Sequence, residues 1–399
     1  MPTIPERIQA FNAGRLPIYT ALKYRNMAEN PFRFLRGSAH LFYEDLSPTF
    51  LPVSPLSWIS GDLHLENFGT YKGDNRLVYF DLNDFDEGAL APAAWELARM
   101  VTSIYTGFES LGIDKKEARR TAALFLQTYS FRLGLGRARY LEKQTARGIV
   151  QLLLDQVAER KQKELIRQRT LLKNDALRLR IDESRFFTLD KVLRKELKVH
   201  FTNWVNEEPT LKSGYRVLDS AFRIAGTGSL GVRRYVFLLQ HKEDLKKYLL
   251  IDMKEALPSC TRVRVSNQQP SWASEAERII AIQERMQNIP PALLSTTNFQ
   301  GVPYVVKEMQ PTADKIDFLL IRERYKDLAC VIEDMALLTA SAQLRSAGRQ
   351  GSAIADALIA FGKEEGWQQG ILDYAEAYAG KVREDYAEYF KAYKAGTFG

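Results

Sequence analysis

The chain has 399 residues, of which 45% are hydrophobic and 26% are charged, and its formal net charge at pH 7 is +7. These values are ordinary for globular proteins and argue against a disordered chain. No apolar run approaches the roughly 18 residues that a membrane-spanning helix needs, and the N-terminus lacks the pattern of a secretory signal. Two cysteines cannot build a disulfide framework. We therefore expect a cytoplasmic protein with no membrane partner.

The pattern of apolar residues predicts the elements in chain order. Residues 1–56 are predicted to be mostly helical, 57–87 to form short strands joined by turns, and 92–199 to be helical again. Residues 215–256 are rich in β-branched and aromatic residues and are interrupted by glycine, which predicts three antiparallel strands. A helix (SEAERIIAIQERMQ) and a strand (FQGVPYVVKEMQP) follow, and the chain is helical from Tyr325 onward. This order predicts an α+β fold with segregated helical and β-rich lobes.

Most of the excess positive charge lies in residues 159–199. A basic stripe can bind nucleic acid or an anionic surface. Here, however, the stretch AERKQKELIRQRTLLKNDALRLRIDE spaces its Leu and Ile residues like an amphipathic helix, whose charged face is simply solvated. No nucleic-acid-binding motif accompanies it, so nucleic acid is not an expected partner.

Two stretches near the N-terminus carry the polar residues of a candidate site. The first, SWISGDLHLENFGTY, holds Asp62 and Asn67, and the second, LVYFDLNDFDE, holds Asp81, Asp84 and Asp86. A carboxylate can orient or deprotonate a hydroxyl group, and an amide oxygen is a hard ligand that suits magnesium. A carboxylate of the second stretch can hold the same ion. The alternative is that these are acidic turns that cap local backbone.

The order and spacing of these motifs resemble the catalytic loop and metal-binding aspartate of the protein-kinase-like superfamily, especially its aminoglycoside and choline kinase branch. That branch has GDLHxxN, then an Asp-Phe-Asp-like strand end. The resemblance implies that Asp62 orients the acceptor hydroxyl and that Asn67 and Asp84 hold magnesium. Asp84 is preferred to Asp81 because its distance to Pro92 fits the antibiotic-kinase pattern better.

A glycine pattern and a lysine follow much later in the chain. The stretch GTGSLG places Gly226, Gly228 and Gly231 in a GxGxxG pattern, and the strand-like VRRYVFLLQ comes next. A Rossmann loop would continue into a helix and a Walker loop would contain GK[ST], so a hairpin folded over phosphates fits better. Lys254 lies in the apolar strand YLLIDMKEA, where a lysine is costly unless it faces a polar cleft. The alternative for Lys254 is an edge strand that faces solvent.

The kinase resemblance gives these residues roles in binding ATP. Lys254 would hold the α- and β-phosphates, with a glutamate partner on the next helix, for which Glu277 is favoured. PYVVKEMQP resembles the strand that enters the hinge, so main-chain groups of Lys307, Glu308 and Met309 would meet the adenine. These motifs follow the catalytic loop instead of preceding it, which implies a circularly permuted protein-kinase-like fold.

The permuted order that the resemblance implies predicts four segments, with the following bounds. Residues 1–145 are the first part of the helical lobe with the catalytic and metal loops, and 146–212 are a basic helical connection. Residues 213–312 are the β-rich nucleotide-binding lobe, and 313–399 are the remaining helices of the helical lobe.

Motifs along almost the whole chain also resemble one large bacterial family of uncharacterised proteins, DUF2252. Among them are MAENPFRFLRGSA, FDLNDFDEGALAPAAWELAR and YAEAYAGKVREDYAEYFKA. Gln343 stands where this family has a histidine, and Glu96 stands where kinases have the aspartate that braces the catalytic loop. Arg36 of FLRG is a candidate anion clamp or a member of a structural ion pair. His64 is interpreted as a hydrogen-bonding brace.

The leading hypothesis is an ATP- and magnesium-dependent phosphotransferase that acts on an unknown hydroxyl-bearing small molecule or protein. Two alternatives stay open from the sequence. One is transfer of AMP from a flipped nucleotide, and the other is a pseudokinase that binds nucleotide and serves as a scaffold.

Overall fold

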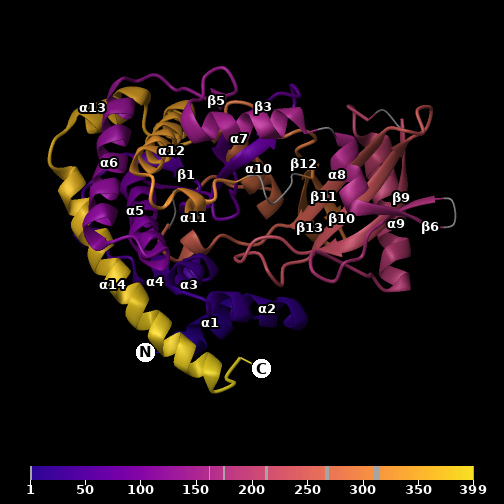
Figure 1. The fold of residues 1–399 in the computed structure, drawn as a ribbon, viewed down its shortest axis with the longest axis horizontal. Helices are drawn as coiled ribbons and strands as arrows, with labels where there is room; N and C mark the ends of the chain where they lie inside the picture. Colours follow the sequence, from indigo (N-terminus) through magenta and orange to yellow (C-terminus); the bar gives the residue numbers. More distant parts are fainter. Residues whose placement is uncertain are drawn as a thin grey trace.

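The computed structural model describes residues 2–160, 162–173, 176–211, 214–265, 269–309 and 315–398. The protein is a mixed α+β protein, and Figure 1 shows a helical part beside a β-rich part. The predicted segregation of helices and strands along the chain is therefore confirmed at the level of the α+β class.

The helical part is built around α5 (Ala93–Ser110), which is buried along nearly its whole length. Its hydrophobic core is continuous with the N-terminal helices and the last helices of the chain. The other helices of this part are α1 (Ile4–Asn12), α2 (Pro17–Met27), α3 (Pro31–Gly37), α4 (Ala39–Asp45), α6 (Lys115–Gly134), α7 (Gly148–Glu159), α11 (Phe318–Ile321), α12 (Tyr325–Arg345), α13 (Ala355–Lys363) and α14 (Trp367–Lys394). A single 3-10 turn, η1 (Pro48–Phe50), follows α4.

Short strands present the polar motifs at the inner side of the helical part. β1 (Leu56–Ile59) pairs with β4 (Ala89–Pro92), and β2 (Phe68–Lys72), β3 (Val78–Leu82) and β5 (Leu141–Glu142) form a second small sheet, all antiparallel. The loop from β1 to β2 carries GDLHLEN, and the loop from β3 to β4 carries NDFDEG. Two polar loops thus leave buried strands on the same side of the core.

The β-rich part is a six-stranded antiparallel sheet in the order β12-β13-β11-β10-β9-β8. Its strands are β8 (Phe186–Phe187), β9 (Tyr215–Arg223), β10 (Arg234–His241), β11 (Tyr248–Glu255), β12 (Ser295–Phe299) and β13 (Val302–Glu308). The three predicted antiparallel strands are confirmed as β9, β10 and β11, and the predicted strand near residue 300 is a hairpin, β12–β13. The predicted helix is α10 (Glu275–Met286), which follows the short turn η2 (Cys260–Val263) and whose apolar face joins the core of the helical part.

The basic segment after residue 159 differs from the predicted amphipathic helix. Helix α8 (Gln162–Arg169) ends early, and β6 (Thr170–Lys173) and β7 (Ala176–Leu179) form a hairpin. Tertiary packing decides this, because Ile166 and Leu179 bury against one face of the six-stranded sheet. Helix α9 (Lys191–Glu207) covers the other face through Phe201 and its neighbours. The segment therefore covers both faces of the sheet.

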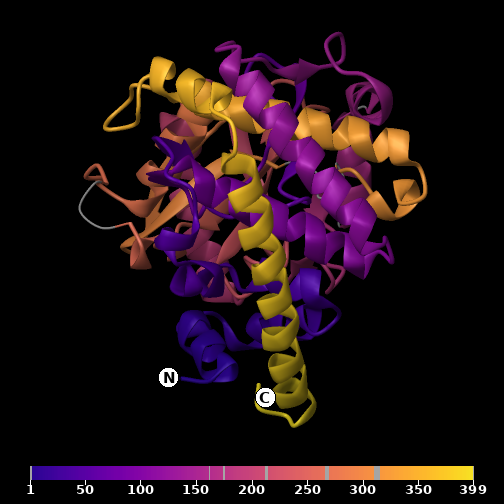
Figure 2. The same ribbon diagram turned by 90° about the vertical axis from the view of Figure 1, so that its left-hand side faces the viewer.

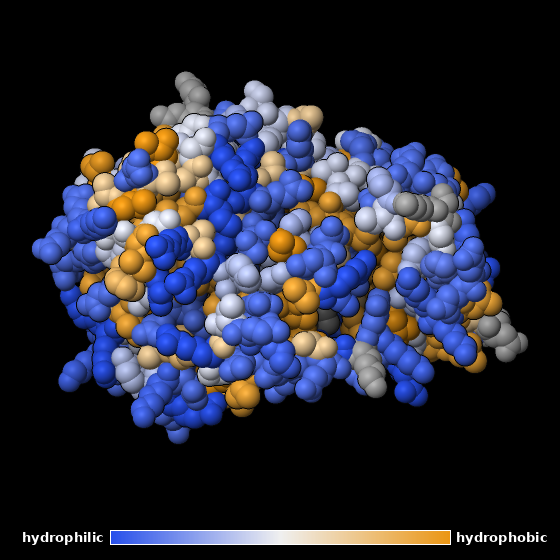
Figure 3. All heavy atoms as spheres, turned by 90° about the horizontal axis from the view of Figure 1, so that it is seen from above, coloured by the Kyte–Doolittle hydropathy of each residue, from blue (hydrophilic) through white to orange (hydrophobic). Residues whose placement is uncertain are grey.

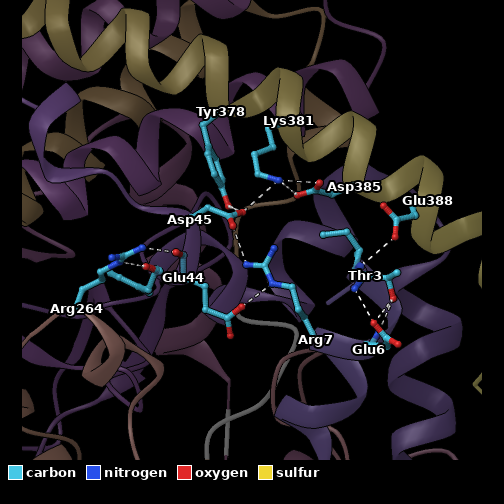
Figure 4. A network of polar contacts seen from close by, with 12 residues as sticks. Thr3, Glu6, Arg7, Glu44, Asp45, Arg264, Tyr378, Lys381, Asp385 and Glu388 are labelled. Atoms are coloured by element: carbon cyan, nitrogen blue, oxygen red, sulfur yellow. Dashed lines mark hydrogen bonds and ion pairs between the residues drawn. The ribbon is translucent and has the colours of Figure 1, made fainter. Parts of the chain in front are cut away.

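The last helix, α14, runs along the outside of the helical part and brings the C-terminus beside the N-terminus (Figures 1 and 2). Gln9 Nε2 donates a hydrogen bond to the Thr397 carbonyl at 3.0 Å. Figure 4 shows the polar network between α1 and α14, in which Arg7 binds Asp45, Asp45 lies 3.4 Å from Lys381 Nζ, and Ile4 N donates to Glu388 Oε1 at 3.0 Å. The two ends of the chain are thus held together by direct contacts.

Hydrophilic residues cover most of the face seen in Figure 3, with smaller hydrophobic patches between them. Within the described residues, none of the helices combines the length and apolar character needed to cross a membrane.

Candidate functional site

A cavity of about 640 Å³ lies between the helical part and the six-stranded sheet. Both polar loops and the glycine-rich β9–β10 loop line it. The predicted site residues that line it are Asp62, Asn67, Asp84, Gly226, Gly228 and Lys254, whereas Gly231, Glu277, Glu308 and Met309 are outside its lining. Residues that are far apart in the sequence therefore share one cavity.

Asp62 is held in the β1–β2 loop by a buried arginine from α5. Its Oδ1 accepts hydrogen bonds from Arg99 Nε at 3.1 Å and from Arg99 Nη2 at 2.7 Å. The Arg99 side chain is fully buried, and the Asp62 side chain is 21% exposed. Burial raises the pKa of Asp62 to about 6, and the Arg99 guanidinium limits that rise. Asp62 thus has one oxygen fixed by Arg99 and a pKa raised to about 6.

Asn67 and His64 shape the same loop. Asn67 Nδ2 donates to the carbonyls of Asp62 at 3.0 Å and of Asp84 at 3.4 Å, so its amide joins the two polar loops. Asn67 also lines the cavity, and among the described residues its Oδ1 accepts no hydrogen bond from the protein. His64 Nδ1 accepts from Glu66 N at 3.1 Å, and burial holds the pKa of His64 well below its ordinary value. His64 is therefore a neutral brace of the loop.

Glu96 and Gln343, the two residues that depart from the expected motifs, hydrogen-bond to each other. Glu96 Oε1 accepts from Ser60 N at 2.6 Å and from Ser60 Oγ at 2.7 Å, and Gln343 Nε2 donates to Glu96 Oε2 at 3.1 Å. All three residues are buried. The longer glutamate therefore braces the backbone before Asp62, and Gln343 binds its second oxygen.

Lys254 meets the second polar loop across the cavity. It lies in the central strand β11, between β10 and β13, so the edge-strand alternative is wrong. Its Nζ forms an ion pair with Asp86 and lies 3.9 Å from an Asp84 oxygen. The exposed fractions of the side chains are 13% for Lys254 and 53% for Asp84. A lysine of the sheet is thus neutralised by two acids of the helical part.

The two acids respond differently to this lysine. Burial alone would raise the pKa of Asp84, but the ammonium groups of Lys254 and Lys307 outweigh it and hold that pKa below the ordinary value. Burial and the adjacent Asp84 charge raise the pKa of Asp86. Asp81 lies outside the cavity lining and faces Arg345, whose Nη2 is 3.5 Å from its carboxylate. Asp84, the most open of the three, remains the metal-binding candidate.

The glycine-rich loop has the hairpin geometry that the sequence suggested. It connects the antiparallel strands β9 and β10, and no helix follows it. Gly226 and Gly231 have φ values of +72° and +86°, a backbone conformation that side chains other than glycine rarely adopt. Gly231 lies outside the cavity because its carbonyl accepts from Leu16 N, and a Cβ there would lie 2.5 Å from Thr20 Oγ1. Gly231 therefore docks the loop on α2.

Glu277 does not pair with Lys254. It is exposed in the first turn of α10, where its carboxylate accepts from Ala273 N at 2.6 Å. Arg278, the next residue, is the buried one, and it donates to the carbonyls of Gly88, Asp86 and Leu257. Glutamate near a helix start is favoured by the local N–H groups, and this local role accounts for Glu277.

Glu308 and Met309 differ from the expected adenine contacts. Glu308 N donates to the Ala292 carbonyl and Met309 N to the Leu250 carbonyl, so both amides are used inside the protein. The Glu308 carboxylate binds Arg76 Nη1 at 2.7 Å. Of the three hinge candidates only Lys307 lines the cavity. The following residues, 310–314, are outside the described part of the chain.

The cavity also contains a charge cluster that sequence reasoning missed. Asp252 is buried on β11 and accepts from Arg223 Nη1 at 2.6 Å and from Arg234 Nη2 at 2.6 Å. The two guanidinium groups outweigh burial and hold the pKa of Asp252 below its ordinary range. Asp252 and Lys254 are two positions apart on one strand, so they share a face. That alternation of charged residues in an apolar strand was the available signal.

Arg36 forms the ion pair that was one of its two predicted roles. Its Nη1 lies 2.6 Å from a Glu66 carboxylate oxygen, and its side chain is 7% exposed. It also lines the cavity, on the side of α3.

The fold and cavity thus define an α+β protein with a polar site between a helical part and a sheet. A family model for uncharacterised proteins conserved in bacteria, DUF2252, matches residues 15–392, so the chain belongs to this family. Searches of curated proteins and of solved structures gave no match.

Proposed function

We propose that this protein is an ATP- and magnesium-dependent phosphotransferase with a circularly permuted kinase-like fold. The observation that carries the proposal is the meeting of Lys254 with Asp84 and Asp86 in a cavity that Asp62 and Asn67 also line. These side chains come from two distant parts of the chain, and in the kinase resemblance these two parts face each other across the nucleotide. The adjacent chain termini also fit a permuted order.

The residues present fit a magnesium ion bound with nucleotide phosphates. Asn67 Oδ1 and the Asp84 carboxylate are hard oxygen donors from adjoining loops. Magnesium commonly takes one or two protein ligands and completes its coordination with phosphate oxygens and water. When bound, the ion would neutralise phosphate charge.

In the proposed reaction the acceptor hydroxyl oxygen bonds to the γ-phosphorus while the bond between this phosphorus and the ADP oxygen breaks. Asp62 orients the hydroxyl and receives its proton. The phosphate oxygens replace Asp86 as the partner of Lys254, and the glycine-rich loop lies over the phosphates. Such catalysis consists mainly of positioning and charge neutralisation.

The test combines binding and transfer. AMP-PNP with magnesium should raise the unfolding temperature of the wild type, and Lys254→Met should weaken this binding by about tenfold to 100-fold through loss of a charged hydrogen bond. Lys246→Met, in the exposed β10–β11 turn, is the matched control.

ATP labelled at the γ or the α position then identifies the group that is moved. Transfer of γ-label supports the proposal, whereas α-label in the product would show nucleotidyl transfer. Nucleotide binding without transfer of either label would instead support a pseudokinase scaffold.

A further inference from the structure

Positively charged side chains gather at the end of the cavity that is formed by helices α1 to α3. The chain provides few negative charges to neutralise them. Lys23 is fully buried, yet its Nζ donates only to the neutral Asn12 Oδ1, at 2.8 Å, and it lies over the Phe11 ring. Within the described part of the chain, no carboxylate lies within ion-pair distance of this amine. A buried cation without such a partner is costly for the folded protein.

Neighbouring cations add to this charge. The Arg15 guanidinium carbon lies 5.3 Å from the Phe11 ring centroid, and both Arg15 and Arg36 line the cavity. Their Nε groups are buried and have no acceptor among the described residues. His40 stacks on Phe11 and is 2% exposed, and neither of its ring nitrogens has a partner there. Arg15 and Arg36 thus bring buried N–H donors without an acceptor to the lining of the cavity.

Among the carboxylates around the cluster, Glu66 forms an ion pair with Arg36, whereas Asp62 and Glu87 bind groups outside the cluster. Asp62 binds Arg99, and the Glu87 carboxylate accepts from Cys260 N. Burial lowers the pKa of Lys23 strongly and Arg15 adds to the effect, while Glu87 and Asp62 only partly oppose it. The Lys23 amine is therefore within electrostatic range of Asp62 but not paired with it.

The cluster is in direct contact with the glycine-rich loop. Arg15 Nη1 donates to the carbonyls of Gly228 and Leu230, and a Cβ at Gly228 would lie 3.4 Å from the Arg36 carbonyl. The cluster therefore borders the glycine-rich loop through Arg15, and Arg36 connects it to the loop that carries Asp62 through the ion pair with Glu66.

We propose that Arg15, Lys23 and Arg36 form an acceptor subsite that binds an anionic group, a carboxylate or a phosphate, of the hydroxyl-bearing acceptor. This proposal rests on the phosphotransferase function proposed above, because only a transfer reaction has an acceptor. The anion would supply the counter-charge that Lys23 lacks, with the hydroxyl directed to Asp62. A neutral or cationic acceptor, such as glycerol or choline, would leave the charge uncompensated.

The test measures binding of matched probes to the protein saturated with AMP-PNP and magnesium. Glycerate and glycerol 3-phosphate carry the two candidate anions, and glycerol is their neutral match. We expect both or one of the anionic probes to bind saturably and glycerol not to bind. Lys23→Met should weaken that binding by about tenfold to 100-fold, and Lys198→Met on the exposed face of α9 should not change it.

Stability separates a binding role from a structural one. Because Lys23→Met removes a buried charge without an acidic partner, its unfolding temperature should equal or exceed that of the wild type. A large drop would indicate that Lys23 is structural and would overturn the proposal. So would absence of anion binding, equal binding by Lys23→Met, or competition of the probes with AMP-PNP. If AMP-PNP fails to bind but Lys23-dependent anion binding persists, the phosphotransferase proposal fails and the anion site stands.

Discussion

Two opposing effects determine the pKa of Asp62. Burial in the β1–β2 loop disfavours its charged form, and the fully buried Arg99 favours it. The balance leaves a carboxyl group that is ionised at neutral pH but close to its titration range. The same burial acts on Asp81, whose pKa is also raised to about 6, outside the cavity lining.

The first prediction concerns the pH dependence of transfer. Because Asp62 is proposed to act as a carboxylate, kcat/KM should fall below a pH of about 6 as the pKa of Asp62 is crossed. Asp62→Asn should lower transfer by about 100-fold or more and remove this acid limb while AMP-PNP binding persists. An acid limb that survives in the variant would assign the titration to another group.

The stability of the folded protein should decrease over the pH range in which the rate of transfer increases. The folded-state pKa of Asp62 is raised above the ordinary value of 3.8, so its contribution is present below about pH 4 and is lost as pH rises through about 6. The free energy of unfolding of the wild type relative to Asp62→Asn should therefore fall by up to about 3 kcal/mol across this range. Urea denaturation at several pH values measures the difference, which cancels the parallel contribution of Asp81.

Among the helices and strands, the sequence predicted those whose conformation is determined by the local pattern of residues. It failed for those whose conformation is determined by tertiary packing. The strands β9 to β11 and helix α10 were predicted from alternation and apolar spacing, and they are present. The hairpin β6–β7 was missed because its helix-like spacing of leucines is overridden by burial of Leu179 against the sheet. Sequence cannot show which partner surface a segment will meet.

The second prediction tests the docking of the glycine-rich loop on α2. Gly231→Ala places a Cβ 2.5 Å from Thr20 Oγ1, whereas Gly14→Ala, also at a positive φ, meets nothing within 4 Å. Both substitutions carry a backbone cost of about 1 kcal/mol, so the difference reports the docking contact. Gly231→Ala should destabilise by about 1–3 kcal/mol more and weaken AMP-PNP binding. Equal effects of the two substitutions on unfolding and binding would show that docking contributes nothing.

At the scale of the whole molecule, the sequence revealed the order of the motifs. It did not reveal that the two chain termini lie next to each other. The prediction that Lys254 meets the acids relied on the kinase resemblance, and these residues do share a cavity. The partner of Lys254 was misassigned to Glu277 because a glutamate at the start of a helix has the same sequence pattern whether it caps the helix or faces a cleft. Asp252 and its arginines were missed because ion pairs between strands depend on the register of the sheet.

The third prediction follows from the adjacent termini. Joining them through a short flexible linker and opening the chain between Arg137 and Ala138, both exposed after α6, would place the sheet before the loop that carries Asp62. Because the ends already touch and the opening lies in an exposed connection, this permutant should fold with stability within about 2 kcal/mol of the wild type. AMP-PNP binding should be retained. An unfolded permutant would show that the connection from α6 to α7 is required for folding.

Arg278 gives α10 an unusual mechanical role. Its guanidinium holds the carbonyls of Asp86 and Gly88, while the apolar face of α10 belongs to the helical core. Any rotation of this helix would pull the backbone that carries the acid facing Lys254. The acidic loop and α10 are therefore coupled through one guanidinium, so a substitution such as Arg278→Met would disturb the position of Asp86 without touching its side chain.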